Sequence, residues 1–161
     1  METPIKKIIL ATDFSDTSKE ASHHALLLAK IYGAELTILH VFDTGAWKTP
    51  SHYYVTTEGY NLAESQDEIR QRGKDSLIKL ADSIDLEVNT IFTEGDPGHE
   101  VIRVAEELDA GLIVLGTHGY SGWKRFAIGS VAEFVTKYAP CAVLTIRPKG
   151  EEKRREERRE D

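Results

Sequence analysis

A glycine-rich segment from Gly116 to Ser130 has the residue types that a phosphate-binding loop needs. Glycines let a backbone approach a ligand closely, and consecutive free N–H groups in such a loop can surround an anion. The segment ends at Gly129 and Ser130, where a helix is expected to start, so unpaired N–H groups and the positive end of the helix dipole would face the same anion. The Ser130 hydroxyl adds one more donor. Together these features suit a di- or triphosphate.

The elements that must position this segment follow from apolar runs that alternate with helical patterns. Helices are expected to begin near Thr17, to span about 63–83, and to follow Gly98 and Gly129. Five strands are predicted, over residues 5–11, 36–42, 86–92, 111–116 and 141–146. Strands that alternate with helices predict an α/β fold of the Rossmann-like kind, with a single doubly wound parallel five-stranded sheet and helices on both faces. Ligands of such sheets bind at the carboxyl ends of the strands, where Gly116 lies.

Length and composition limit the classes of protein to which the chain can belong. Its 161 residues predict one domain over 1–148, followed by a charged C-terminal tail over 149–161. The net charge of −7 argues against nucleic acid and anionic membranes as partners. No stretch approaches the ~18 apolar residues of a membrane span, and the N-terminus has no signal-peptide pattern. The single cysteine, Cys141, lies in an apolar run, as expected of a buried thiol in a reducing compartment, so a cytoplasmic location is expected.

The spacing Gly-x2-Gly-x9-Gly-Ser, formed by Gly116, Gly119, Gly129 and Ser130, resembles the ATP-binding signature of the universal stress protein family. Three other segments fit the same resemblance, which extends over about residues 5–147. These are the strand-to-loop segment 11–15, the end of the second strand at 40–41, and the turn at 95–97. The resemblance implies that the protein binds ATP.

The resemblance also implies roles for individual residues. Asp13, which follows the pair Ala11 and Thr12, would contact the ribose or organise a Mg2+ or Mn2+ ion with the phosphates. The backbone of Val41 would bind adenine. Gly116 would lie against the ribose, and the phosphates would be held by Gly119, Gly129, Ser130 and Val131. Relatives often have proline where this chain has Ala11, a difference that should not prevent binding.

Each of these residues also has a purely structural interpretation. The glycines could be turn residues, Ser130 could serve as a helix N-cap, and Asp13 could cap or close a turn. His118 fits a plain loop residue, and Lys124 and Arg125 fit either solvated charges or groups that offset phosphate charge. The full spacing after a predicted strand favours nucleotide binding over these separate interpretations.

Three functions remain open at this point. The favoured one is an ATP-binding stress-response protein with slow or no hydrolysis, acting as a nucleotide-dependent regulator or chaperone-like factor. The alternatives are a slow ATPase or phosphotransferase, and a dimerisation module that binds no nucleotide. No Walker-type Gly-x4-Gly-Lys-Ser/Thr loop is present and no catalytic base can be named, so the chain is at most a slow ATPase.

Two further expectations concern surfaces. The apolar strand over 141–146 is expected at a sheet edge, where it would pair with a second copy to form a homodimer, as relatives commonly do. The connection over 43–61 is long and carries Trp47 and several tyrosines. It is therefore interpreted either as a lid over the nucleotide or as a segment that packs on the domain or its partner.

Overall fold

A computed structural model describes residues 5–45, 66–117 and 128–147. Its strands are β1 (Lys7–Ala11), β2 (Glu35–Asp43), β3 (Val88–Gly95), β4 (Leu112–Gly116) and β5 (Ala142–Ile146). Its helices are α1 (Asp16–Tyr32), α2 (Gln66–Asp82), α3 (Pro97–Leu108) and α4 (Ser130–Tyr138). Gly119, most of the predicted lid and the charged tail lie outside the described residues.

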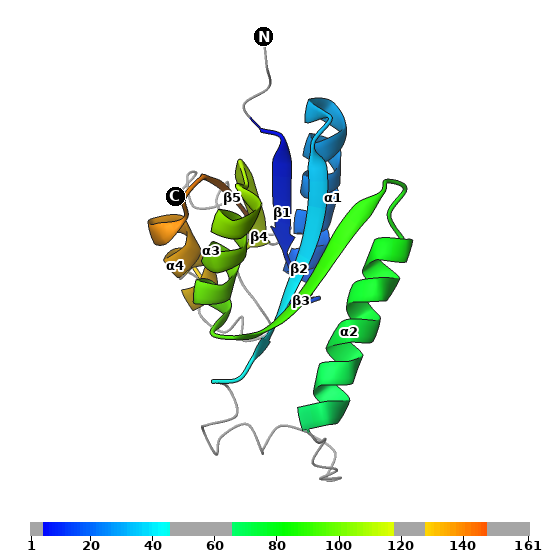
Figure 1. Cartoon of the computed structure of the whole chain (residues 1–161), viewed down its shortest axis with the longest axis vertical. Helices are drawn as coiled ribbons and strands as arrows, with labels where there is room; N and C mark the ends of the chain where they lie inside the picture. Colours follow the sequence, from blue (N-terminus) through cyan, green and yellow to red (C-terminus); the bar gives the residue numbers. More distant parts are fainter. Residues whose placement is uncertain (1–4, 46–65, 118–127, 148–161) are drawn as a thin grey trace, which may run out of the picture.

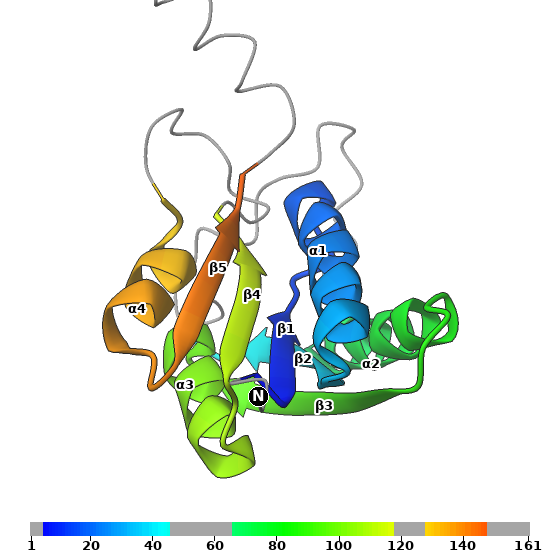
Figure 2. The same ribbon diagram turned by 90° about the horizontal axis from the view of Figure 1, so that it is seen from above.

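The five strands form one parallel sheet in the order β3-β2-β1-β4-β5. Helices α1 and α2 cover one face of this sheet, and α3 and α4 cover the other (Figures 1 and 2). The predicted fold class is therefore confirmed. Within the described residues, no helix is long and apolar enough to cross a membrane.

The core consists of two apolar layers separated by the sheet. Alternate residues of β1 enter different layers: Ile8 and Leu10 pack under α1 and α2, whereas Ile9 packs under α3 and α4. All three are fully buried, because a parallel sheet covered on both faces leaves its central strands no exposed side. This double covering is why these strands read in the sequence as continuous apolar runs.

The start of α1 differs slightly from the start expected near Thr17. The N-cap is Ser15, whose hydroxyl accepts the N–H of Ser18, and the first helical residue is Asp16. The turn after β1 is tighter than the sequence pattern indicates, since Phe14 adopts a left-handed φ of 64°. Only residues 12–15 separate β1 from α1, so the first turn of the helix lies beside the carboxyl end of the sheet.

Gly73 in the middle of α2 has a packing reason. A Cβ at this position would lie 3.0 Å from Nε2 of His40 and 3.2 Å from the Phe92 ring. The glycine therefore lets α2 approach β2 and β3 closely, which offsets its low helix propensity.

Candidate functional site

A cavity of about 370 Å³ opens at the carboxyl ends of β1, β2 and β4. The chain passes from β1 outward to β3 and then returns to β4 on the other side of β1, so the strand order reverses at this place. Ligands of doubly wound sheets bind at such a switch point, and the volume lies in the range of small-molecule sites. The lining residues are Ala11, Thr12, Asp13, Ser18, Leu39, Val41, Asp43, Pro97, Val101, Leu115, Gly116, Thr117, Gly129, Ser130, Val131 and Ala132.

The turn between β1 and α1 forms one wall and carries Asp13. Its Oδ1 atom accepts the N–H of Ser15 at 3.0 Å and the hydroxyl of Ser18. The same Ser18 hydroxyl accepts the N–H of Asp13 at 3.3 Å. Oδ2 has no hydrogen-bond partner within residues 5–45, 66–117 and 128–147. Asp13 is thus the turn residue that one interpretation expected, and one of its carboxylate oxygens remains available to a ligand.

The end of β2 forms the second wall. The ladder between β1 and β2 finishes at the pair Ala11 and Leu39, after which the Thr12 N–H donates to the Leu39 carbonyl at 2.9 Å. Peptide groups alternate in direction along a parallel strand, so those of Val41 point to the same side as those of Leu39. Because β1 has already ended, Val41 has no partner strand there among the described residues. Its N–H and C=O form a donor and acceptor pair at the cavity.

The first turn of α4 forms the third wall. Its first intrahelical bond joins the Glu133 N–H to the Gly129 carbonyl, which leaves the N–H groups of the preceding three helical residues without helical partners. Those three residues, Ser130, Val131 and Ala132, all line the cavity. The N-cap is Gly129 and no side chain caps the helix, so Ser130 is not the N-cap that the structural interpretation proposed. N–H groups that have no partner among the described residues and a positive dipole end therefore meet at the cavity, an arrangement that suits an anion.

Gly116 has a structural role in addition to its place in the cavity wall. A Cβ at Gly116 would lie 2.8 Å from Cγ2 of Thr17. The residue must therefore be small so that the start of α1 can pack against the end of β4.

All of the sequence-predicted site residues that are described line this one cavity, and Gly119 lies outside the described residues. Sequence reasoning did not name the other lining residues, which are Ser18, Leu39, Asp43, Pro97, Val101, Leu115, Thr117 and Ala132. Asp43 follows Val41 by two positions and so shares its side of β2, which is a signal that period-two alternation could have provided. Ser18 reaches the cavity through the packing of α1, for which the sequence carries no local signal, whereas Pro97 belongs to the 95–97 turn that the family resemblance included.

Comparison with known proteins identifies the family. The universal stress protein family model matches residues 4–147. Universal stress protein MJ0531 of Methanocaldococcus jannaschii is 35% identical over 160 residues, which cover 93% of this chain and 87% of that protein. The structure of the hypothetical protein MJ0577, from the same organism, matches with a TM-score of 0.74 at 25% identity, covering 92% of this chain and 99% of that one. A universal stress protein in complex with cAMP matches with a TM-score of 0.56 at 25% identity, covering 89% of this chain and 97% of that one. The chain therefore belongs to the universal stress protein family.

Proposed function

We propose that the cavity binds an adenine nucleotide, with ATP as its physiological form, and that the protein acts as a nucleotide-dependent regulator or chaperone-like factor in the stress response. The observation that carries the proposal is that two different recognition elements meet at one cavity. The N–H and C=O of Val41, which have no partner among the described residues, match the acceptor and donor on the edge of adenine. The free N–H groups at the start of α4 match phosphate oxygens. A relative that was solved in complex with cAMP supports the adenine class.

A divalent ion fits the chemistry of this cavity. The titratable side chains among its described lining residues are Asp13 and Asp43, so the lining supplies no cationic side chain to offset phosphate charge. Mg2+ is commonly held by one or two carboxylates together with phosphate oxygens and water. Oδ2 of Asp13 would provide such a ligand, and Mg2+ or Mn2+ would neutralise part of the triphosphate charge.

Hydrolysis is expected to be slow or absent. Fast hydrolysis needs a group that positions the attacking water and charges that stabilise the transition state. Oδ1 of Asp13 is already held by Ser15 and Ser18, and Asp43 uses its Oδ1 to accept the Gly45 N–H at 2.8 Å. A multiple-turnover assay reaching about 1 s⁻¹ would favour the alternative of an ATPase.

The proposal is tested by analysing what the purified protein carries. Heat denaturation releases a bound nucleotide, which ion-exchange chromatography then identifies. We expect an adenine nucleotide in the released fraction, or saturable ATP binding if the protein purifies empty. Absence of both would leave the dimerisation module as the better account.

A further inference from the structure

His40 joins β2 to the turn that carries Asp13. It immediately precedes Val41, and alternation along β2 sends its side chain to the opposite face of the sheet, under α1 and α2. There the imidazole Nδ1 lies 2.8 Å from the carbonyl oxygen of Thr12. Thr12 and Asp13 both line the cavity. One side chain from β2 therefore contacts the backbone of the neighbouring wall.

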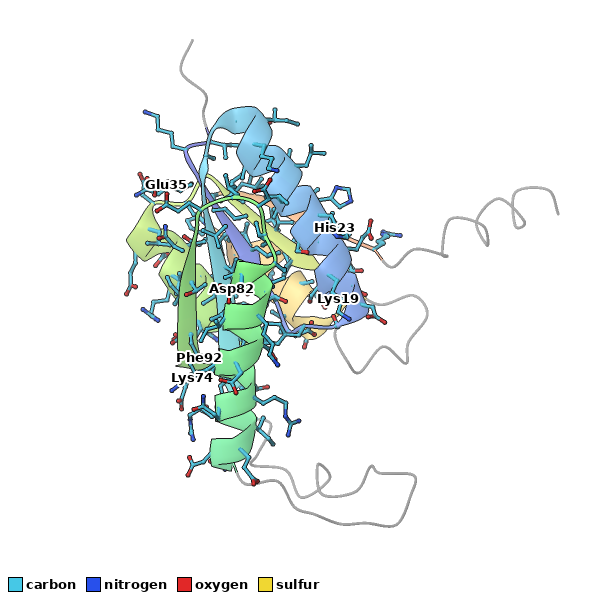
Figure 3. The ribbon with its side chains drawn as sticks, turned by 90° about the vertical axis from the view of Figure 1, so that its right-hand side faces the viewer. Lys19, His23, Glu35, Lys74, Asp82 and Phe92 are labelled. Atoms are coloured by element: carbon cyan, nitrogen blue, oxygen red, sulfur yellow. The ribbon has the colours of Figure 1, made fainter. Side chains whose placement is uncertain are left out.

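The other neighbours of His40 are apolar and close. The Phe14 ring lies 4.5 Å from the imidazole, and the Phe92 ring lies 5.7 Å from it, measured between ring centroids. Nε2 faces Gly73 of α2, where a Cβ would lie 3.0 Å away. Figure 3 shows Phe92 beside Lys74, where β3 meets α2, and the Lys74 ammonium lies 5.2 Å from the centre of that ring.

These contacts determine the protonation form of the ring. A carbonyl oxygen can only accept, so Nδ1 carries the hydrogen and donates it to Thr12. In the neutral ring Nε2 then carries no hydrogen. This form fits its position, because Nε2 faces Gly73, which has no side chain to accept a hydrogen bond. Burial lowers the pKa of His40, although the hydrogen bond to Thr12 and the charge of Asp13 act in the opposite direction. The neutral ring with hydrogen on Nδ1 is the form that fits this site.

The turn that His40 contacts needs external support. Phe14 adopts the left-handed region, with φ of 64°, which bulky residues avoid unless their surroundings hold them there. Local bonds supply part of that support, since the Phe14 N–H donates to Oγ1 of Thr12 and the Ser15 N–H donates to Asp13. From outside the turn, the Leu39 carbonyl accepts the Thr12 N–H, and His40 adds a side-chain contact because it bonds the Thr12 carbonyl and packs against the Phe14 ring.

We propose that His40 is a positioning residue of the nucleotide site. Its Nδ1–H bond to the Thr12 carbonyl fixes the β1–α1 turn, and thereby Asp13, relative to Val41. The inference rests on the proposed function for its effect on affinity, but the hold on the turn exists with or without a ligand. Gly73 contributes to the same arrangement, because a glycine at this position leaves room for the imidazole of His40.

Three substitutions separate positioning from packing. His40→Leu keeps the volume and removes the donor, and it should weaken ATP binding about tenfold, as expected for loss of one useful hydrogen bond. His40→Asn places an amide N–H near the position of Nδ1 and should restore affinity to within about threefold of wild type. Phe92→Leu is the matched control: it disturbs the same cluster without touching Thr12, so it should lower the melting temperature while leaving ATP affinity within about threefold.

Gly73→Ala provides an independent test from the opposite side of the ring. Alanine is the better helix former, so α2 itself should not be weakened. Its Cβ nevertheless presses on Nε2 of His40 and should weaken ATP binding by a smaller factor than His40→Leu. A weaker ATP affinity in Gly73→Ala without a loss of helix stability would indicate that His40 positions the site. Simple destabilisation of the fold would not produce that combination.

A ligand-free measurement tests the hold on the turn even if no nucleotide binds. Hydrogen exchange of the Phe14 and Ser15 amides should be severalfold faster in His40→Leu than in wild type, and near wild type in His40→Asn and Phe92→Leu. If wild type binds no adenine nucleotide, the proposed function fails and the exchange rates alone decide the role of His40. Unchanged exchange in His40→Leu, or ATP affinity in His40→Asn as weak as in His40→Leu, would overturn the inference.

Discussion

The backbone carbonyl of Thr117 accepts a hydrogen bond from the N–H of Gly129, and the Thr117 N–H donates to the Ile146 carbonyl at 2.8 Å. Thr117 is only 2% exposed. One buried residue thus fixes the end of β4, the end of β5 and the start of α4 to each other through backbone bonds. The position of the α4 N-terminus at the cavity consequently does not depend on the Ser130 side chain, which is left available to a ligand.

Ser130→Ala should therefore weaken ATP binding without destabilising the protein. We expect a loss of about 1 kcal/mol, or roughly fivefold in affinity, which is the usual contribution of one hydrogen bond. Adenosine, which has no phosphate, should bind equally to both proteins. Thr136→Ala on the same helix is the control: it removes a bond to the Ala132 carbonyl and should leave ATP affinity unchanged. Calorimetric titrations with both ligands provide the test, and equal ATP affinities in wild type and Ser130→Ala would contradict it.

Asp13→Asn should separate the turn role of Asp13 from its role at the metal. Asparagine keeps the oxygen that accepts from Ser15 and Ser18, so the melting temperature should change little. The lost charge should weaken ATP binding about tenfold when Mg2+ or Mn2+ is present, on the scale of charge-assisted bonds. Titrations with the ion and with a chelator give the comparison, and Asp16→Asn, an exposed change at the start of α1, is the control. An undiminished metal effect in Asp13→Asn would reject the role of Asp13 as a ligand.

The proposed homodimer is tested at the sheet edge. Among the described strands β5 pairs only with β4, so its other side is an edge of this sheet, as the sequence predicted. Val143 and Leu144 pack against the core, which makes exposed Ala142 the better position for a charge. Ala142→Lys should shift the molar mass in light scattering from dimer towards monomer. Thr90→Lys, an exposed change on the opposite edge strand β3, should not. A wild-type protein that stays monomeric at high concentration would argue against the dimer.

His40 should make the stability of the fold depend on pH. Its pKa is lowered in the fold, chiefly by burial, so below its ordinary value of about 6.5 the unfolded chain takes up the proton first. The contribution of the neutral His40 ring to the free energy of unfolding is fully present above about pH 6.5. It is lost as the pH falls towards the pKa of His40 in the folded protein. The charge of Asp13 opposes this lowering of the His40 pKa. The nearby cations of α2 face aromatic rings: Lys74 lies over Phe92 and Arg70 lies over Phe42.

Urea unfolding at several pH values measures this contribution. The difference in unfolding free energy between wild type and His40→Asn should stay constant above about pH 7. From about pH 6.5 downward, wild type should lose stability relative to His40→Asn. A difference that stays flat down to pH 5 would show that His40 does not titrate differently in the folded protein.

The sequence predicted the sheet and the cavity wall well, because both depend on local patterns. Fully buried strands such as β1 produce apolar runs, and the glycine spacing marks where β4 gives way to α4. The start of α1 was predicted one residue late, near Thr17 rather than at Asp16, since the left-handed Phe14 in the preceding turn has no signature in residue type. The contact between His40 and Thr12 depends on the pairing of two strands and on the space left by Gly73, so no local pattern could reveal it.

Calorimetry tests whether an adenine nucleotide binds at the cavity between β1, β2 and α4. MgATP should be titrated into nucleotide-free wild-type protein, with MgGTP as the comparison, because guanine reverses the donor and acceptor that Val41 would meet. We expect saturable binding of one ATP per chain and markedly weaker binding of GTP. Absence of saturable heat with ATP up to about 1 mM, where binding free energy is only about −4 kcal/mol, would contradict it.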